Sequence, residues 1–207
     1  MKNSKIRFIQ LTLAIFLFAV LANCTGERIL KKYYVFNELT DSTYVLRKPL
    51  PYSVMIEPFW ANPAYKTKQI ALRTKDHEIQ YYYYHQWSEA PDIALRFLVW
   101  RKLKSLNLFQ NCELAIGQVF PKYGIGGTLD WLEIRQRDKN HKYPLARIKA
   151  RLELFDFKTR QTVIVHSFAR SAELPKKYSM NQFVSVVNQM VNQELDRFIQ
   201  KILETLQ

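Results

Sequence analysis

The sequence predicts an α/β fold, and two observations support that class. Segments in which polar and apolar residues alternate, or in which β-branched and aromatic residues gather, recur between residues 33 and 169, and such segments favour β-strands. Two longer segments, at about 89–106 and 180–206, repeat their apolar residues every three or four positions, which is typical of helices. No Pro-, Gly- or Ser-rich linker separates these segments, so we expect a single domain over 33–207.

The N-terminus has the pattern of a bacterial lipoprotein signal peptide. Three cationic residues within the first seven precede a mostly apolar run at 8–22, which is shorter than the ~20 residues of a membrane-spanning helix. The sequence Leu21-Ala22-Asn23-Cys24 then resembles a lipobox, with Asn23 where Gly or Ala is more usual. We expect cleavage between Asn23 and Cys24, and attachment of diacylglycerol and an N-acyl chain to Cys24, which anchors the protein durably. An ordinary secretory signal with an incidental cysteine is the alternative.

Removal of 23 of the 207 residues leaves 184, enough for one domain with its own core. Three of the 13 net positive charges are lost with the signal peptide, which leaves +10. The remaining charges are scattered, so we expect a solvated basic surface, with anionic lipid or an acidic protein as the alternative. Nucleic acid is not an expected partner of an exported protein. Residues 24–32 form only a short tether, and Cys112, the one cysteine besides Cys24, is expected to be a buried apolar residue.

The first half of the domain contains strand-like segments at 33–36, 52–59, 69–74 and 78–84. The last two are separated by Lys75-Asp76-His77, which indicates a hairpin with a polar turn. The second arm of this hairpin contains Tyr81, Tyr82, Tyr83 and Tyr84. Together with Trp87 they could contact lipid, glycan or a partner if one face is exposed, whereas burial on both faces of the sheet is the alternative.

Helix signals flank the later strands. Ser88 is a candidate N-cap and Pro91 suits a first turn, while Ser179-Met180-Asn181-Gln182 has the form of a capping box. Between the two helices we expect strands at 113–120, 128–136, 146–156 and 162–169, with the even positions of 146–156 facing the core. The glycine-rich segment 124–127 is expected to be a turn.

The sequence contains no motif of a hydrolase, metalloenzyme or phosphate-binding loop. The four histidines are far apart and are expected at the surface, namely His77, His85, His141 and His166. Carboxylates such as Glu57, Asp92 and Asp130 show no spacing that demands a catalytic pair. We therefore expect no enzymatic activity, no metal and no cofactor besides the covalent lipid.

Beyond these patterns, the mature chain resembles the ABC-type transport auxiliary lipoprotein family, whose members accompany MCE-type lipid transporters of diderm bacteria. The most recognisable element is the aromatic, Trp, acidic and Pro sequence within 84–91, ahead of an amphipathic helix. The likeness extends through almost the whole mature chain and is carried by Tyr33–Phe36, Val54–Phe59, Tyr65–Arg73, Tyr84–Pro91, Leu95, Leu98, Leu103 and Leu108–Phe109.

This resemblance implies a three-layer α/β domain with a mixed sheet of about five to seven strands and two main helices, and no catalytic site. It implies attachment to the periplasmic side of the outer membrane, with which Thr25 after the cysteine agrees. It also implies an MCE-domain protein and an ABC permease and ATPase as partners in moving phospholipid between membranes, and a homo-oligomeric ring. The alternatives are an envelope lipoprotein that itself binds a lipid or glycolipid, and an assembly factor for lipopolysaccharide.

Overall fold

A computed structural model describes residues 30–37, 46–138 and 141–206. The predicted signal peptide and the predicted cleavage and lipidation residues, Asn23 and Cys24, lie outside these residues. From Lys31 onward the described chain forms one compact unit. Its elements are β1 (Lys32–Tyr34), β2 (Leu50–Ile56), β3 (Trp60–Ala61), the 3-10 helix η2 (Pro63–Tyr65), β4 (Gln69–Lys75), β5 (Glu78–Trp87), α2 (Pro91–Ser105), β6 (Phe109–Glu113), β7 (Tyr123–Arg135), β8 (Leu145–Asp156), β9 (Thr162–Glu173) and α3 (Met180–Leu206).

The sheet is built around the long strand β7. One edge of β7 pairs antiparallel with β8, which pairs antiparallel with β9. The other edge pairs in parallel with β2, β3 and β4 in turn, at Val54↔Tyr123, Trp60↔Thr128 and Ala71↔Glu133. The expected hairpin is present as β4 and β5, with Lys75 opposite Glu78, and β1 adds to β5 in parallel.

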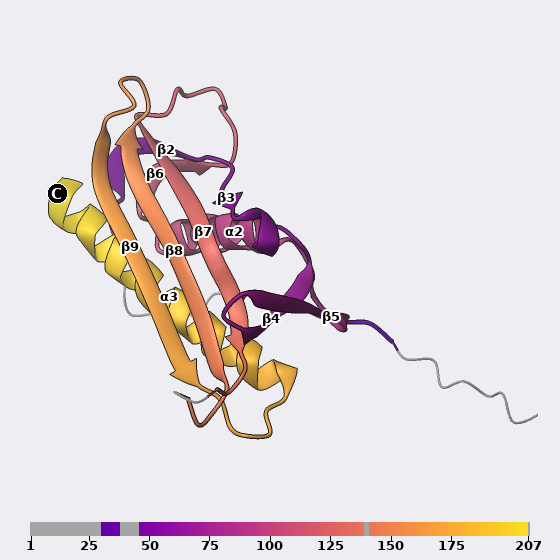
Figure 1. Cartoon of the computed structure of the whole chain (residues 1–207). Coiled ribbons are helices and arrows are strands. Elements are labelled where there is room, and N and C mark those ends of the chain that lie inside the picture. The colour runs from indigo at the N-terminus through magenta and orange to yellow at the C-terminus, as the bar shows by residue number, and fades with distance from the viewer. Residues whose placement is uncertain (1–29, 38–45, 139–140, 207) are drawn as a thin grey trace, which may run out of the picture. The chain divides into compact units, whose positions relative to one another are not determined.

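Both helices pack on the same face of this sheet, as Figure 1 shows for α2 behind β7 and α3 behind β8 and β9. They meet where Lys102 Nζ of α2 lies 2.7 Å from Asp196 Oδ1 of α3. The expected even positions of β8 are buried in one core with both helices, from Ala146 to Leu154. The mixed α/β class with two helices is confirmed. The described part has nine strands rather than about five to seven. Its two helices lie on one face of the sheet, whereas the resemblance implied a three-layer domain.

The capping box at the start of α3 is confirmed. The Gln182 backbone N–H donates to Ser179 Oγ at 3.2 Å, and the Ser179 N–H donates to Gln182 Oε1 at 2.8 Å. For α2 the N-cap prediction was wrong, because the cap residue is Ala90 and Ser88 lies two residues before it. Pro91 does occupy the first turn, where its missing N–H costs no hydrogen bond.

Two other predictions between the helices were wrong. Residues 114–122 connect β6 to β7 without regular structure, and the expected turn at 124–127 lies inside β7. The glycines are required there by close packing of aromatic rings: a Cβ at Gly124 would lie 2.2 Å from Phe155 Cζ, and one at Gly127 would lie 2.5 Å from Phe59 Cδ2. Neither has a positive φ, so space and not backbone freedom selects glycine.

Candidate functional site

The candidate site is a groove of about 780 Å³ between β1, β5 and the segment that leads into α3. Pairing of β1 with β5 brings Lys32 opposite His85, and the N-terminal end of α3 closes the other side. The groove is lined by Lys32, Tyr33, Tyr34, Tyr82, His85, Lys176, Lys177, Tyr178, Ser179, Met180 and Asn181.

Hydrogen-bonded aromatic groups form the wall of the groove. Tyr34 Oη lies 2.8 Å from His85 Nδ1, and Tyr82 Oη lies 3.2 Å from Tyr178 Oη. Burial raises the pKa values of Tyr34 and Tyr178, and a hydrogen bond with Tyr82 raises that of Tyr178 further. The phenols are therefore protonated at neutral pH, and Tyr34 acts as a hydrogen-bonding group rather than a nucleophile.

The rim of the groove is basic. Lys32, Lys176 and Lys177 are exposed, and no lining residue in the described part of the chain is acidic. Just outside the groove, Lys31 Nζ lies 4.6 Å from the centre of the Tyr83 ring. Lysine ammonium groups beside aromatic rings suit a ligand with an anionic end and an apolar body.

The structure separates the predicted contact residues on β5. Tyr82 lines the groove, while Tyr81, Tyr83 and Tyr84 are 38%, 60% and 40% exposed, so the alternative of two-sided burial was wrong. The Tyr81 hydroxyl donates to the Ala64 carbonyl at 2.8 Å, and the Tyr83 and Tyr84 rings meet edge to face. The exposure of these three residues agrees with the position of β5 next to the edge strand β1.

Trp87 does not line this surface. It is 1% exposed, its ring stacks on Phe36 with centres 4.8 Å apart, and it lies 6.1 Å from Phe183 of α3. Its predicted role as a direct contact residue is therefore not available in this structure. Trp87 instead fixes β5 against the core, and it indirectly holds the groove in shape.

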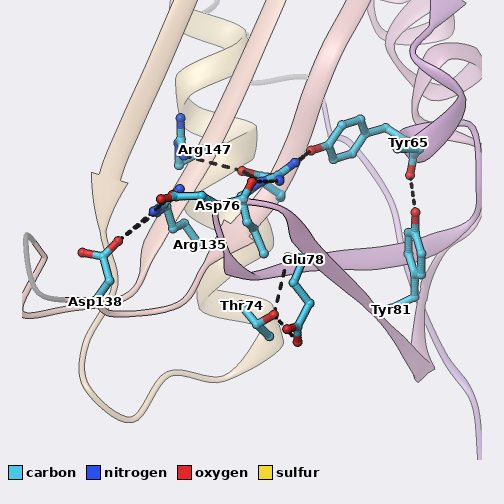
Figure 2. Close-up of polar contacts among 11 residues, drawn as sticks. Tyr65, Thr74, Asp76, Glu78, Tyr81, Arg135, Asp138 and Arg147 are labelled. Atoms are coloured by element: carbon cyan, nitrogen blue, oxygen red, sulfur yellow. Dashed lines mark hydrogen bonds and ion pairs between the residues drawn. The ribbon is translucent and has the colours of Figure 1, made fainter.

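A buried carboxylate fixes the β4–β5 hairpin to the rest of the sheet (Figure 2). Glu133 of β7 is 1% exposed and accepts hydrogen bonds from Arg73 Nε at 2.8 Å and the Tyr65 hydroxyl at 2.5 Å, with Arg147 Nη1 3.6 Å away. Burial, followed by the hydrogen bond to Glu133, raises the pKa of Tyr65 to about 12. The hairpin that carries the four tyrosines is thus anchored by β7 and β8.

A second set of ion pairs fastens the turn of that hairpin. Arg135 Nη2 lies 2.6 Å from Asp76 Oδ1 and 2.8 Å from Asp138 Oδ2, as Figure 2 shows. In the same hairpin, the Thr74 hydroxyl donates to Glu78 at 2.7 Å. Sequence reasoning missed the Arg135–Asp76 pair because its partners are 59 residues apart.

The histidines and carboxylates considered above occupy unrelated places. Glu57 pairs with Arg160 and Asp130 pairs with Lys149, while Asp92 is buried in the first turn of α2. His85 lines the groove, and the expectation of a surface position was wrong for His166, which is 6% exposed and bonded to Glu194. Among residues 30–37, 46–138 and 141–206 no cluster of three metal-ligand side chains occurs.

Cys112 is buried, and burial raises the pKa of its thiol to about 12. It is thus a packed apolar residue, as expected, and not a reactive thiolate. In the described part of the chain, no helix has the length and apolar character needed to cross a membrane.

No protein-family model matches the chain, and no curated protein matches it either. Solved structures do share its fold. Protein XCC0632 from Xanthomonas campestris, of the family model DUF330, matches with a TM-score of 0.69 at 14% identity over 84% of this chain and 96% of that one. A crystal structure of an uncharacterized protein matches with a TM-score of 0.61 at 16% identity over 84% and 99% of the two chains.

A more distant similarity is to the PelC dodecamer from Paraburkholderia phytofirmans, with a TM-score of 0.41 at 11% identity over 79% of this chain and 92% of that one. The first two similarities establish a shared fold. This third one is too weak to support an argument about assembly.

Proposed function

We propose that the chain is a non-catalytic accessory lipoprotein, anchored through Cys24 to the periplasmic side of the outer membrane, that helps an ABC/MCE-type transporter move phospholipid between membranes. The observation that supports this proposal is the groove: three lysines surround a wall of hydrogen-bonded tyrosines at β1, the first described strand. A phospholipid headgroup has the matching chemistry, an anionic phosphate next to apolar chains.

The position of the groove along the chain supports the same proposal. Lys32 follows Cys24 by eight residues, and each residue spans at most about 3.6 Å, so the tether can extend no further than roughly 29 Å. A lipid-anchored Cys24 therefore keeps β1 close to the headgroups of its own membrane. The exposed tyrosines Tyr83 and Tyr84 lie on the neighbouring strand and provide a surface for the transporter.

Site-specific photocrosslinking in cells tests the partner. A photoreactive amino acid in place of Tyr83 is expected to form an adduct with an MCE-domain protein or a permease subunit. The same amino acid at Val165, an exposed residue on the far strand β9 (43% exposed, against 60% for Tyr83), serves as the control and should give much less of that adduct. Adducts only with unrelated envelope proteins at Tyr83 would contradict the proposal.

A second candidate function is that of an envelope protein that itself carries a lipid or glycolipid. The volume and aromatic lining of the groove favour it. Native mass spectrometry of the full chain released from detergent micelles distinguishes the two: a carrier retains one phospholipid per chain, whereas an accessory protein that contacts headgroups only in passing retains none.

A further inference from the structure

A second cavity, of about 530 Å³, lies between β9 and the C-terminal half of α3. Its charged and titratable lining residues are His166 and Arg170 from the strand, and Glu194, Arg197, Lys201 and Glu204 from the helix. Glu194 lies 13 positions after Asn181 of the groove, which corresponds to about 20 Å along the helix axis. The cavity and the groove are therefore separate sites.

Glu194 organises the cavity. Its side chain is 1% exposed, and it accepts hydrogen bonds from Arg170 Nε at 2.5 Å, His166 Nε2 at 2.9 Å and Arg197 Nη1. Burial opposes ionisation of this carboxyl, but the hydrogen bonds from Arg170 and His166 outweigh it and keep the Glu194 pKa below its ordinary value. With its oxygens engaged, Glu194 holds two guanidinium groups in place and has little capacity left to bind a cation.

The arginines retain unused donors. Arg170 donates to Glu194 through Nε and Arg197 through Nη1, so each guanidinium has further N–H groups available, and the two side chains are 45% and 52% exposed. Lys201 adds an ammonium group to the same lining. A fork of fixed guanidinium donors matches the oxygens of phosphate.

His166 holds Glu194 from the strand side of the cavity. The residue is 6% exposed. Burial lowers the His166 pKa, against the opposing effect of Glu194, so the ring is neutral at pH 7 and donates from Nε2 to the carboxylate. Nδ1 is itself buried and has no hydrogen-bond partner among the described residues, so it does not contact a ligand in the cavity.

We propose that this cavity binds a phosphate group. Arg170, Arg197 and Lys201 bind its anionic oxygens. Inorganic phosphate has this chemistry, and so does the phosphomonoester headgroup of a phosphatidic acid. The inference is independent of the function proposed for the groove.

Calorimetric titration of the full chain in neutral detergent micelles tests the site, with inorganic phosphate as the probe. We expect one saturable site, weakened at least tenfold by Arg197→Gln, less by Arg197→Lys, and severalfold by Lys201→Gln, which leaves the hydrogen bonds of Glu194 intact. Lys158→Gln, which removes one exposed charge outside both sites, is the matched control and should bind phosphate as the unchanged protein does.

A further ligand sharpens the test. Dihexanoyl phosphatidic acid is tested in competition with inorganic phosphate. If the lipid competes and binds more tightly, a lipid is the source of the phosphate group. If inorganic phosphate binds more tightly, the ligand is the free ion. The proposal would be overturned if phosphate showed no saturable binding. It would also be overturned if the Arg197→Gln and Lys201→Gln variants bound phosphate as tightly as the unchanged protein does.

Discussion

The groove at β1 and β5 and the cavity between β9 and α3 are both lined by cations, but they hold them in different ways. In the groove, exposed lysines surround tyrosines that hydrogen-bond to one another and to His85. In the cavity, a carboxylate that is 1% exposed fixes two arginines. Flexible lysines attract an anion without defining its position, whereas clamped guanidinium groups select an oxyanion of defined geometry. The difference fits a transient headgroup contact in the groove and a small, specific ligand in the cavity.

The largest expected effect of a single substitution is on stability. Glu194→Ala removes the acceptor of three cationic or polar groups, one of which, His166, is buried. Breaking a buried pair on one side costs about 3–5 kcal/mol, and we expect the lower end because both arginines are half-exposed. Urea unfolding measures the change, and Lys177→Gln in the groove should shift the free energy of unfolding by less than about 0.5 kcal/mol.

Binding of a lipid headgroup should depend on the lysines of the groove and not on the cavity. Replacing Lys32, Lys176 and Lys177 by Gln removes three cations, each worth about 1 kcal/mol beside an anionic lipid. Affinity for dihexanoyl phosphatidylglycerol, measured by titration of the full chain in micelles, is expected to fall by up to ~100-fold, while inorganic phosphate should bind the cavity unchanged.

A control variant with the same loss of charge separates the effect of the groove on headgroup binding from the effect of net charge. Three exposed lysines outside both sites, changed together to Gln, should weaken headgroup binding only slightly; they are Lys75, Lys142 and Lys158. An equal loss in this control would show that net charge, and not the groove, attracts the lipid.

A smaller effect is expected from pH. The folded-state pKa of His166 lies below its ordinary value of 6.5, mainly because of burial, so the unfolded chain binds this proton more readily. Stability should therefore be full above pH 6.5 and decrease as the pH falls through that value. His166→Asn should flatten this part of the curve of unfolding free energy against pH, and an unchanged slope would contradict the assignment of a neutral, buried ring.

Elements that depend on local pattern could be predicted from the sequence. The Ser179–Gln182 box marks the start of α3, and the polar turn at Lys75–His77 marks the hairpin, because both signals lie within a few residues. Tertiary packing decided the rest. Gly124 and Gly127 resembled a turn but lie within β7, where two rings exclude a Cβ.

The sites themselves could be predicted only in part. The tyrosine run was visible, but Tyr34, Tyr82 and Tyr178 come together from positions up to 144 residues apart. His166 and Glu194 are 28 residues apart, and nothing in either segment indicates that α3 packs on β9 in the register that pairs them. Trp87 was grouped with the tyrosine run as a possible contact residue, but it lies where β5 meets the core.

The most direct test of the central claim is a measurement of phospholipid transport between membranes in cells that carry Cys24→Ser. The substitution lies outside the folded unit that begins at Lys31, so we expect an unchanged unfolding midpoint, loss of the protein from the outer-membrane fraction and loss of transport. Transport that continues undiminished while the protein is absent from the outer membrane would contradict the account.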